Sequence, residues 1–479
     1  MNQPNLSFNS QSIFLESNSG TYTYKDVEDY TKSMTNWLAQ NWPYFHKPKI
    51  ALEANSSDEL FLTMAACWIL ELPIIPLDVA FISRSKIERV DPEIFFGRSH
   101  SALSKFDSLH IPALTFDSIK ACSLELEVET RKLNSDGLFA YLFTSGSSGR
   151  AKLVPCKKDQ MVHAAMHSAG LIKPGPKGLW LHCLPLSHMG GVSIIPRSLE
   201  YNTGIYRADG FNAETIADLI TNNPRIEIVS LVPTMLKRLL DVENFKPNPN
   251  LKALFLGGGP ISQNLLEIAH DKGLPIVTSY GMTETCGMIA AQKYKPENAE
   301  STGFTLEGNE IKIQDDKGQT AQTGASGLIL VKGPQVFDGY TDEENNRESF
   351  DEEGWFRTGD FGSMDSKGCL TVEARRTDLI ISGGENVSPY EIETMINALP
   401  GVLESAVTGV PDEEWGQKIV ALITFEMAEL EDIDQVTTSL KQMLPPYKIP
   451  KSILSVKSLP KTSLGKLQRE EIRKMVLEL

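Results

Sequence analysis

The chain has 479 residues, of which 41% are hydrophobic and 23% charged, a balance that supports a large buried core and excludes wholesale disorder. Because domains commonly span about 100–200 residues, this length predicts two to four packed units. Asp and Glu total 62 against 46 Lys and Arg, a net charge of −16 that argues against a nucleic-acid partner.

The cysteines and the apolar runs indicate where such a chain resides. Six scattered cysteines form no CxxC pair, so we expect neither a zinc site nor a disulfide framework. The N-terminus has no basic segment followed by an apolar stretch, so we expect no signal peptide. The apolar run 62–77 is broken by Glu71, Pro73 and Pro76, which predicts a buried helix and strand. We expect a cytoplasmic protein with no membrane span, and a homo-oligomer is left open.

The first part of the chain alternates short apolar strands with longer helical patterns. We expect strands at 49–53, 73–76, 178–182, 227–231 and 253–256, and helices at 57–70, 213–221 and 234–241. Repeated strand–helix–strand order indicates an α/β fold, in which helices cover both faces of parallel sheets.

The pattern changes at about residue 310. Strands at 311–314, 327–331 and 369–372 are separated by Gly and Asp turns, which predicts a small antiparallel barrel or meander over about 310–376. Beyond residue 376 a compact α+β pattern follows, with helices around 390–399 and 432–444. We therefore expect a large domain over 1–376 and a small domain over 377–479.

The segment 141–152, with the sequence YLFTSGSSGRAK, combines a strand with a loop of small residues that closes on Lys152. Gly146 and Gly149 let the backbone turn tightly and approach a ligand, and Lys152 supplies a positive charge. The hydroxyl donors are those of Thr144, Ser145, Ser147 and Ser148. The loop therefore suits nucleotide phosphates. It is not a Walker A loop, and the structural alternative is a flexible Gly/Ser turn, which the residues favour less than phosphate binding.

Two further motifs suit the rest of a nucleotide. Three glycines and a proline, Gly257, Gly258, Gly259 and Pro260, follow a strand and would let a flat ring approach the backbone. In the segment 279–285, Tyr280 could stack on a base and Glu284 could hold Mg²⁺, which prefers oxygen ligands. A sharp turn and a helix cap at Thr283 are the structural alternatives.

Three more motifs lie toward the C-terminus. The segment 354–360 ends in Asp360, whose carboxylate could accept both hydroxyls of a ribose, or could simply lie beside a β-turn. The segment 375–386 opens with Arg375 and ends a strand at Gly383 and Gly384. The loop 459–469 contains Lys466, and alone it reads as solvated charge.

These six segments, in this order, resemble the adenylate-forming superfamily of acyl-CoA synthetases, peptide-synthetase adenylation domains and luciferases. The resemblance spans roughly residues 141–469. It implies ATP, CoA and Mg²⁺ as co-substrates and cofactor. It also implies two helix-flanked sheets and a barrel-like subdomain in the large domain, with a mobile α+β C-terminal domain. In this family a carboxylic acid becomes an acyl-adenylate, and a thiol then displaces AMP.

The resemblance also implies a role for each motif residue. Thr283 would meet the α-phosphate, Glu284 the Mg²⁺, and Lys466 would bridge the carboxylate and the α-phosphate. Asp360 and Arg375 would hold the ribose. The residues around the phosphates are implied to be Thr144 to Lys152, and those around the adenine Gly257, Gly258, Gly259, Pro260, Tyr280 and Gly281.

The second half-reaction needs room for a thiol where Lys466 had been. The family provides it by rotating the small domain about a hinge, and the matching position here is Thr377. Many members carry Asp or Lys there, so Thr377 is a departure from the pattern. Gly383 and Gly384 would then line the channel for the thiol.

The segment 185–191, PLSHMGG, bears on which carboxylic acid is the substrate. The resemblance places His188 at the acyl pocket, together with Gly257 and Gly281. The chain looks most similar to the o-succinylbenzoate–CoA ligases of menaquinone biosynthesis, which tend to carry Arg or Lys where this chain has Arg197. A buried cation would anchor the dicarboxylate's unactivated carboxylate. The alternatives are Arg197 on a solvated helix face, another acyl- or aryl-CoA synthetase, or an adenylation enzyme loading a carrier protein.

Overall fold

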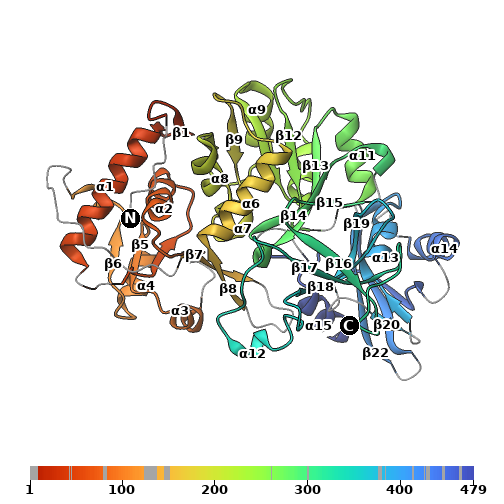
Figure 1. Ribbon diagram of the computed structural model, residues 1–479. Helices are drawn as coiled ribbons and strands as arrows, with labels where there is room; N and C mark the ends of the chain where they lie inside the picture. Colours follow the sequence, from red (N-terminus) through yellow and green to blue (C-terminus); the bar gives the residue numbers. More distant parts are fainter. Residues whose placement is uncertain are drawn as a thin grey trace.

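A computed structural model shows the architecture (Figure 1). The structure describes residues 9–42, 44, 46–78, 83–122, 137–144, 152–259, 261–298, 301–375, 380–382, 385–412, 415–425, 427, 432–444, 448–462 and 467–478.

A six-stranded sheet forms the part nearest the N-terminus, in the order β6-β5-β3-β4-β7-β8. Neighbouring strands are parallel except β7 and β8, which are antiparallel. The strands are β3 Ile50–Glu53, β4 Ile74–Leu77, β5 Ile94–Gly97, β6 Ala113–Thr115, β7 Leu138–Thr144 and β8 Lys152–Lys157. The helices of this part are α1 Tyr24–Asn41, α2 Asp58–Leu70, α3 Arg84–Val90, α4 His100–Asp107 and α5 Asp117–Lys120.

A thirteen-stranded sheet forms the centre, in the order β16-β17-β18-β19-β15-β14-β13-β12-β11-β9-β10-β1-β2. The run from β1 through β10, β9, β11 and β12 to β13 is parallel. The strands are β1 Ile13–Ser17, β2 Thr21–Thr23, β9 Leu179–His182, β10 Gly204–Arg207, β11 Ile226–Leu231, β12 Ala253–Leu256, β13 Ile276–Met282, β14 Gly287–Lys293, β15 Gly303–Thr305, β16 Glu310–Gln314, β17 Gly327–Lys332, β18 Phe356–Met364 and β19 Cys369–Arg375.

Helices cover both faces of this central sheet, as expected for the α/β class (Figure 1). Along β9, Trp180 packs into one hydrophobic core, whereas its neighbours Leu179 and Leu181 pack into another. This alternation follows from the two-residue period of a strand. The helices of the two faces are α6 Lys158–Leu171, α7 Met189–Val192 and α8 Ile194–Tyr201 on the Trp180 side, and α9 Ala213–Asn222, α10 Pro233–Leu240 and α11 Gln263–Asp271 on the other.

The strands expected to form a small antiparallel unit over about 310–376 are antiparallel and are joined to the large sheet. β15 is hydrogen-bonded to β14 on one side and to β19 on the other. The hydrogen bonding is therefore continuous from β13 through β14, β15 and β19 to β18. The short helices nearby are η1 Thr283–Thr285, η2 Pro296–Asn298 and α12 Glu343–Asn346.

A separate five-stranded sheet lies beyond residue 380, with β23 between β20 and β22 and with β24 also paired to β23. Its elements are β20 Ile380–Ser382, β21 Glu385–Val387, α13 Pro389–Asn397, β22 Val402–Asp412, β23 Gly416–Phe425, α14 Ile433–Met443, β24 Ser452–Ser455 and α15 Arg469–Glu478. This sheet has its own hydrophobic core, which includes Ile392, Val407 and Ile419. The predicted boundary at residue 376 and the hinge at Thr377 lie outside the described residues and stay predictions.

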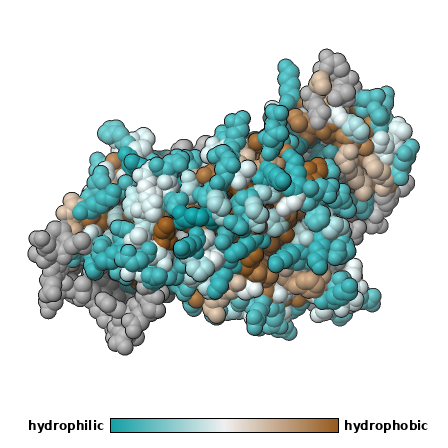
Figure 2. Space-filling model, turned by 90° about the horizontal axis from the view of Figure 1, so that it is seen from above, coloured by the Kyte–Doolittle hydropathy of each residue, from teal (hydrophilic) through white to brown (hydrophobic). Residues whose placement is uncertain are grey.

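Hydrophilic side chains cover most of the face seen in Figure 2, with smaller hydrophobic patches between them. Within the described part of the chain, no helix combines the length and the apolar character that a bilayer crossing requires.

A buried ion pair joins α2 to β10 and so links the two large sheets. The Nε of Arg207 lies 2.6 Å from Oδ1 of Asp58, and both side chains are buried. Arg207 also donates to the carbonyl of Ser56 at 2.5 Å and to the carboxylate of Asp209.

Replacing Arg207 by methionine is expected to lower the free energy of unfolding by about 3–5 kcal/mol, because Asp58 would keep a buried charge without its partner. Urea denaturation measures this loss. The double variant Arg207→Met with Asp58→Leu removes both charges and should recover most of the stability. A single variant as stable as the parent would show that the pair contributes nothing.

Candidate functional site

The predicted phosphate loop lies at the end of a β-hairpin. β7 and β8 pair so that Thr144 and Lys152 face each other across the ladder. Residues 145–151, which include Ser145, Gly146, Ser147, Ser148 and Gly149, lie outside the described residues. This pairing places Thr144 and Lys152 opposite each other, at the two ends of the predicted loop.

Tyr280 and Asp360 meet in the central sheet, although 80 residues separate them. The phenol of Tyr280, on β13, donates to Oδ2 of Asp360 at 2.8 Å. Asp360 is only 7% exposed. It lies inside β18, directly after Gly359 at φ 77°, and not at a turn. The close approach of an aromatic ring and a carboxylate fits an adenine beside a ribose. Arg375 pairs with Asp360 across β18 and β19, but its side chain lies outside the description.

Glu284 lies in the short helix η1, which directly follows β13. Glu284 is 7% exposed, and its carboxylate accepts a hydrogen bond of 2.8 Å from the phenol of Tyr340. The backbone N–H of Phe337 donates to the Glu284 carbonyl at 2.8 Å, which fixes the turn. Thr283 precedes Glu284 in the same turn, so a hydroxyl and a carboxylate are presented together.

Tyr340 also connects Glu284 with Lys152. The Lys152 ammonium lies 4.5 Å from the centroid of the Tyr340 ring, within the range of a cation–π interaction. One tyrosine therefore contacts both the cation at the base of the loop and the carboxylate of η1. The arrangement places a cation over the ring of Tyr340 and a carboxylate at its hydroxyl, so groups that suit a phosphate chain and its metal ion lie near each other.

The donor set fits Mg²⁺ only if a substrate completes it. Among the described residues, no group of three or more His, Cys, Asp or Glu side chains could hold a metal ion. Mg²⁺ commonly keeps several waters and binds through one or two carboxylates together with substrate phosphates. The single buried carboxylate of Glu284 suits that mode.

The glycines of the two central motifs are needed for close backbone packing. A Cβ on Gly257 would lie 2.4 Å from the Ser279 hydroxyl oxygen, and one on Gly281 would lie 1.9 Å from the Gly287 carbonyl oxygen. Strand packing thus explains both glycines without a ligand. Gly258 has φ 74°, a backbone conformation that an L-residue rarely adopts. Gly259 follows it, and Pro260 lies outside the described residues.

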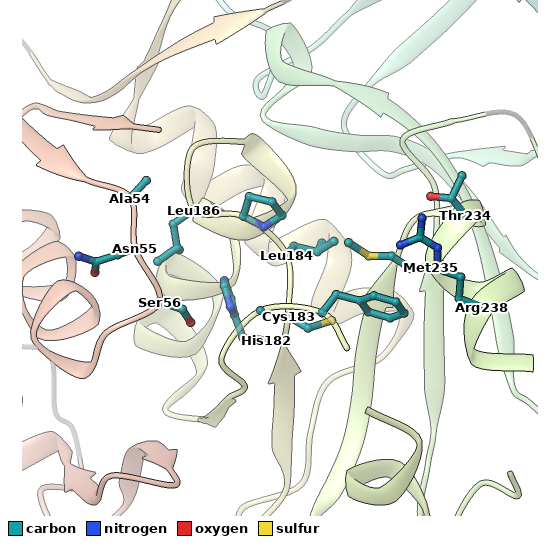
Figure 3. A pocket seen from close by; sticks show the side chains of 13 residues that line it. Ala54, Asn55, Ser56, His182, Cys183, Leu184, Leu186, Thr234, Met235 and Arg238 are labelled. Carbon is teal, nitrogen blue, oxygen red and sulfur yellow. The ribbon is translucent and has the colours of Figure 1, made fainter. Parts of the chain in front are cut away.

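His188 lies at the start of α7 and its side chain is exposed. A cavity of about 300 Å³ opens at the ends of β3 and β9, and neither His188 nor Arg197 lines it. Figure 3 shows this cavity, which is lined by residues of the segments 54–56, 182–186, 210–211 and 234–238. His182, on its wall, is buried, and burial lowers the pKa of this histidine to about 4. Its ring is therefore neutral at pH 7.

Arg197 is buried on α8, with 6% of its surface exposed. The alternative that Arg197 lies on a solvated helix face is therefore wrong. Its Nε has no hydrogen-bond partner, and no ion pair to Arg197 is found in the described part of the chain. The guanidinium lies 5.4 Å from the centre of the Trp180 ring. Burial lowers the pKa of Arg197 to about 10, so the group stays charged at pH 7.

Three predicted residues of the C-terminal motifs also cannot be placed. Lys466, Gly383 and Gly384 lie outside the described residues, so the adenylation lysine and the thiol channel stay predictions.

The model of the AMP-binding enzyme family matches residues 7–341, and that of its C-terminal domain matches residues 391–466.

The chain belongs to the AMP-binding enzyme family. Among relatives of this AMP-binding enzyme, the 2-succinylbenzoate–CoA ligase of Listeria monocytogenes is 38% identical over 334 residues, 69% of each chain. The o-succinylbenzoate CoA synthetase of Bacillus subtilis with its acyl-adenylate intermediate is similar with a TM-score of 0.87 and 29% identity, covering 98% of this chain and 96% of that one. The same enzyme with ATP and magnesium ion has a TM-score of 0.87 and 30% identity, covering 97% of each chain.

Sequence reasoning missed two aromatic residues of this AMP-binding enzyme. Tyr340 belongs to none of the six motifs, and the sequence predicts Trp180 only as part of the strand at 178–182. Both have aromatic rings that contact a cation, Lys152 and Arg197 respectively. A signal that could have drawn attention to Trp180 is its place five residues before the segment that contains His188.

Proposed function

We propose that this chain is an AMP-forming acid–thiol ligase that converts 2-succinylbenzoate into 2-succinylbenzoyl-CoA, a step of menaquinone biosynthesis. ATP and the acid would give an acyl-adenylate and pyrophosphate, and CoA would then displace AMP. Family membership and the ligand-bound relatives support the two-step chemistry. We place the reaction in the cytoplasm, where ATP and CoA are both supplied.

The observation that carries the choice of acid is the buried, unpaired charge of Arg197. Burying a charge without a counter-ion is costly, so such a group is expected to meet an anion when the site is filled. Guanidinium groups bind carboxylates through two parallel hydrogen bonds. A second carboxylate on the substrate would supply this partner, whereas a simple fatty acid would leave the charge uncompensated.

The described residues account for how the reactants are held. Carboxylate and α-phosphate repel each other, so the site must supply positive charge between them. Lys152 would contact the outer phosphates, Glu284 would hold Mg²⁺, and Asp360 would accept the ribose hydroxyls. Bound Mg²⁺ would neutralise phosphate charge. No general base is required, because a carboxylic acid is already ionised at pH 7.

We further propose that the small domain over 377–479 carries Lys466 to the site and then rotates away. Gly383 and Gly384 would line the thiol channel after that rotation. The separate core of this part and its own sheet support an independent unit.

Replacing Arg197 by methionine is expected to raise the KM for 2-succinylbenzoate by about 10- to 100-fold, since a charge-assisted hydrogen bond contributes about 1.5–3 kcal/mol. Pyrophosphate release measures this change. The controls are two monoacids, each lacking one of the two carboxylates, 4-oxo-4-phenylbutanoate and 2-butanoylbenzoate. The monoacid that is accepted should show almost no change in KM.

Equal effects on the diacid and the monoacid would contradict the choice of acid. The same assay with free CoA also separates this proposal from carrier-protein loading. Thioester formation without any carrier protein is expected.

A further inference from the structure

An unpaired cation in a protein interior must be held in place by groups that do not neutralise it. In the described part of the chain, the guanidinium of Arg197 lies over the ring of Trp180, with 5.4 Å between the guanidinium carbon and the ring centre. No carboxylate pairs with Arg197 in this part of the chain. The contact that the structure does provide is therefore aromatic and uncharged.

Trp180 is itself fixed from several directions. It is 3% exposed and lies on β9, the middle of the parallel part of the central sheet. Its ring stacks on Phe255 of β12, with 5.4 Å between ring centres and an angle of 11°. Its indole N–H donates to the hydroxyl of Ser230 at 3.1 Å. The ring cannot turn without losing both contacts, so it offers Arg197 a rigid surface.

An aromatic ring and a carboxylate differ in which part of a guanidinium they occupy. The N–H donors of a guanidinium lie in its plane, and a carboxylate binds along that plane. A ring that contacts the face of the group leaves the in-plane donors free. A resident Asp or Glu would instead use those donors and compete with the substrate. Trp180 can thus hold the cation while its donors remain available.

Little empty space borders the guanidinium of Arg197. A cavity lined by Arg197, Trp180 and Tyr201 has a volume of about 10 Å³, enough for one water at most. In another direction Nη2 approaches Gly287, where an added Cβ would lie 3.4 Å away. Gly287 is three residues beyond Glu284, so the cation lies close to the turn that would hold the metal ion.

We propose that Trp180 is a positioning residue for substrate specificity, which holds the Arg197 guanidinium by its face so that the in-plane donors can bind the substrate's unactivated carboxylate. This inference rests on the proposed function. It adds that the preference for a dicarboxylate depends on an aromatic residue that itself does not contact the reacting atoms.

The test compares Trp180→Leu and Trp180→Phe in the pyrophosphate-release assay, with 2-succinylbenzoate and the accepted monoacid. Trp180→Leu should raise the KM for the diacid about tenfold and leave kcat and the monoacid KM nearly unchanged. Trp180→Phe keeps an aromatic face and should recover most of the affinity. Equal losses for both acids, or no recovery with phenylalanine, would show that Trp180 acts only through packing.

Coupling to Arg197 provides the second readout. In an Arg197→Met background, Trp180→Leu should cause no further rise in the diacid KM, because the cation that it positions is gone. A full additional rise would overturn the inference. If Arg197→Met alone loses no preference for the diacid, the proposed function fails first. If Arg197→Met loses the preference for the diacid but Trp180→Leu keeps it, the inference fails and the proposed function stands.

A milder variant covers the case in which Trp180→Leu does not fold. Ser230→Ala removes the hydroxyl that accepts from the indole N–H and leaves the ring in place. It should raise the diacid KM about threefold, without an effect on the monoacid. An unchanged diacid KM would overturn the positioning role.

Discussion

Glu284→Gln is expected to slow adenylate formation by about 10³-fold, the largest effect that we expect from a residue within the described site. Glutamine has the same shape and can still accept the hydrogen bond from Tyr340, so the turn should keep its structure. It lacks the charge that Mg²⁺ requires. Pyrophosphate release measured across a range of Mg²⁺ concentrations should therefore show a shift to higher Mg²⁺ as well as a lower maximal rate.

Tyr340→Phe is the matched control for this substitution. It removes the hydrogen bond to Glu284 but keeps both the carboxylate and the ring that contacts Lys152. Its rate should fall by about tenfold, in line with one hydrogen bond to a charged group. A Glu284→Gln enzyme with an unchanged Mg²⁺ dependence would contradict the assignment of Glu284 to the metal.

Lys466→Ala is expected to abolish adenylate formation, with a loss of at least about 10³-fold, and to spare thioester formation from acyl-adenylate that is made beforehand. The lysine would neutralise charge only in the first step, and the small domain would carry it away before the second. The two steps are measured separately, by pyrophosphate release and by thioester formation from supplied adenylate.

Lys461→Ala provides the control within the same C-terminal segment. Lys461 forms an ion pair with Glu404, in the small domain, and has no assigned part in the reaction. Its loss should leave both steps within about twofold of the parent, as for most exposed ion pairs. If Lys466→Ala lowered both steps equally, the lysine would not be specific to adenylation.

The elements were largely predictable because their signals are local. The helix expected at 57–70 is α2, Asp58–Leu70, whose N-cap Ser57 accepts from the N–H of Leu60 and whose C-cap Glu71 is left-handed at φ 55°. The strand expected at 253–256 is β12 without a shift. How the strands from residue 310 onward join the central sheet was not predictable, because that pairing depends on β15, which is only three residues long.

The site was less predictable because it depends on contacts between distant segments. The six motifs indicated Asp360 and Tyr280 separately, but no local pattern shows that their side chains share a hydrogen bond. For Arg197 the residues leave two interpretations open, and only the packing of α8 against α6, α2 and β10 decides for burial. Tyr340 and Trp180 contribute ring faces, which have no motif of their own and become visible only when a cation lies above them.

The continuity of the central sheet has a consequence for how this protein can be divided. A fragment that ended near residue 310, where the helical pattern stops, would remove β19 and leave β15 without its outer partner. An uncovered strand edge readily pairs with other chains, which leads to aggregation. Truncations intended to isolate the large domain should therefore extend through the end of β19 at Arg375, even though the helix-flanked layers end far earlier.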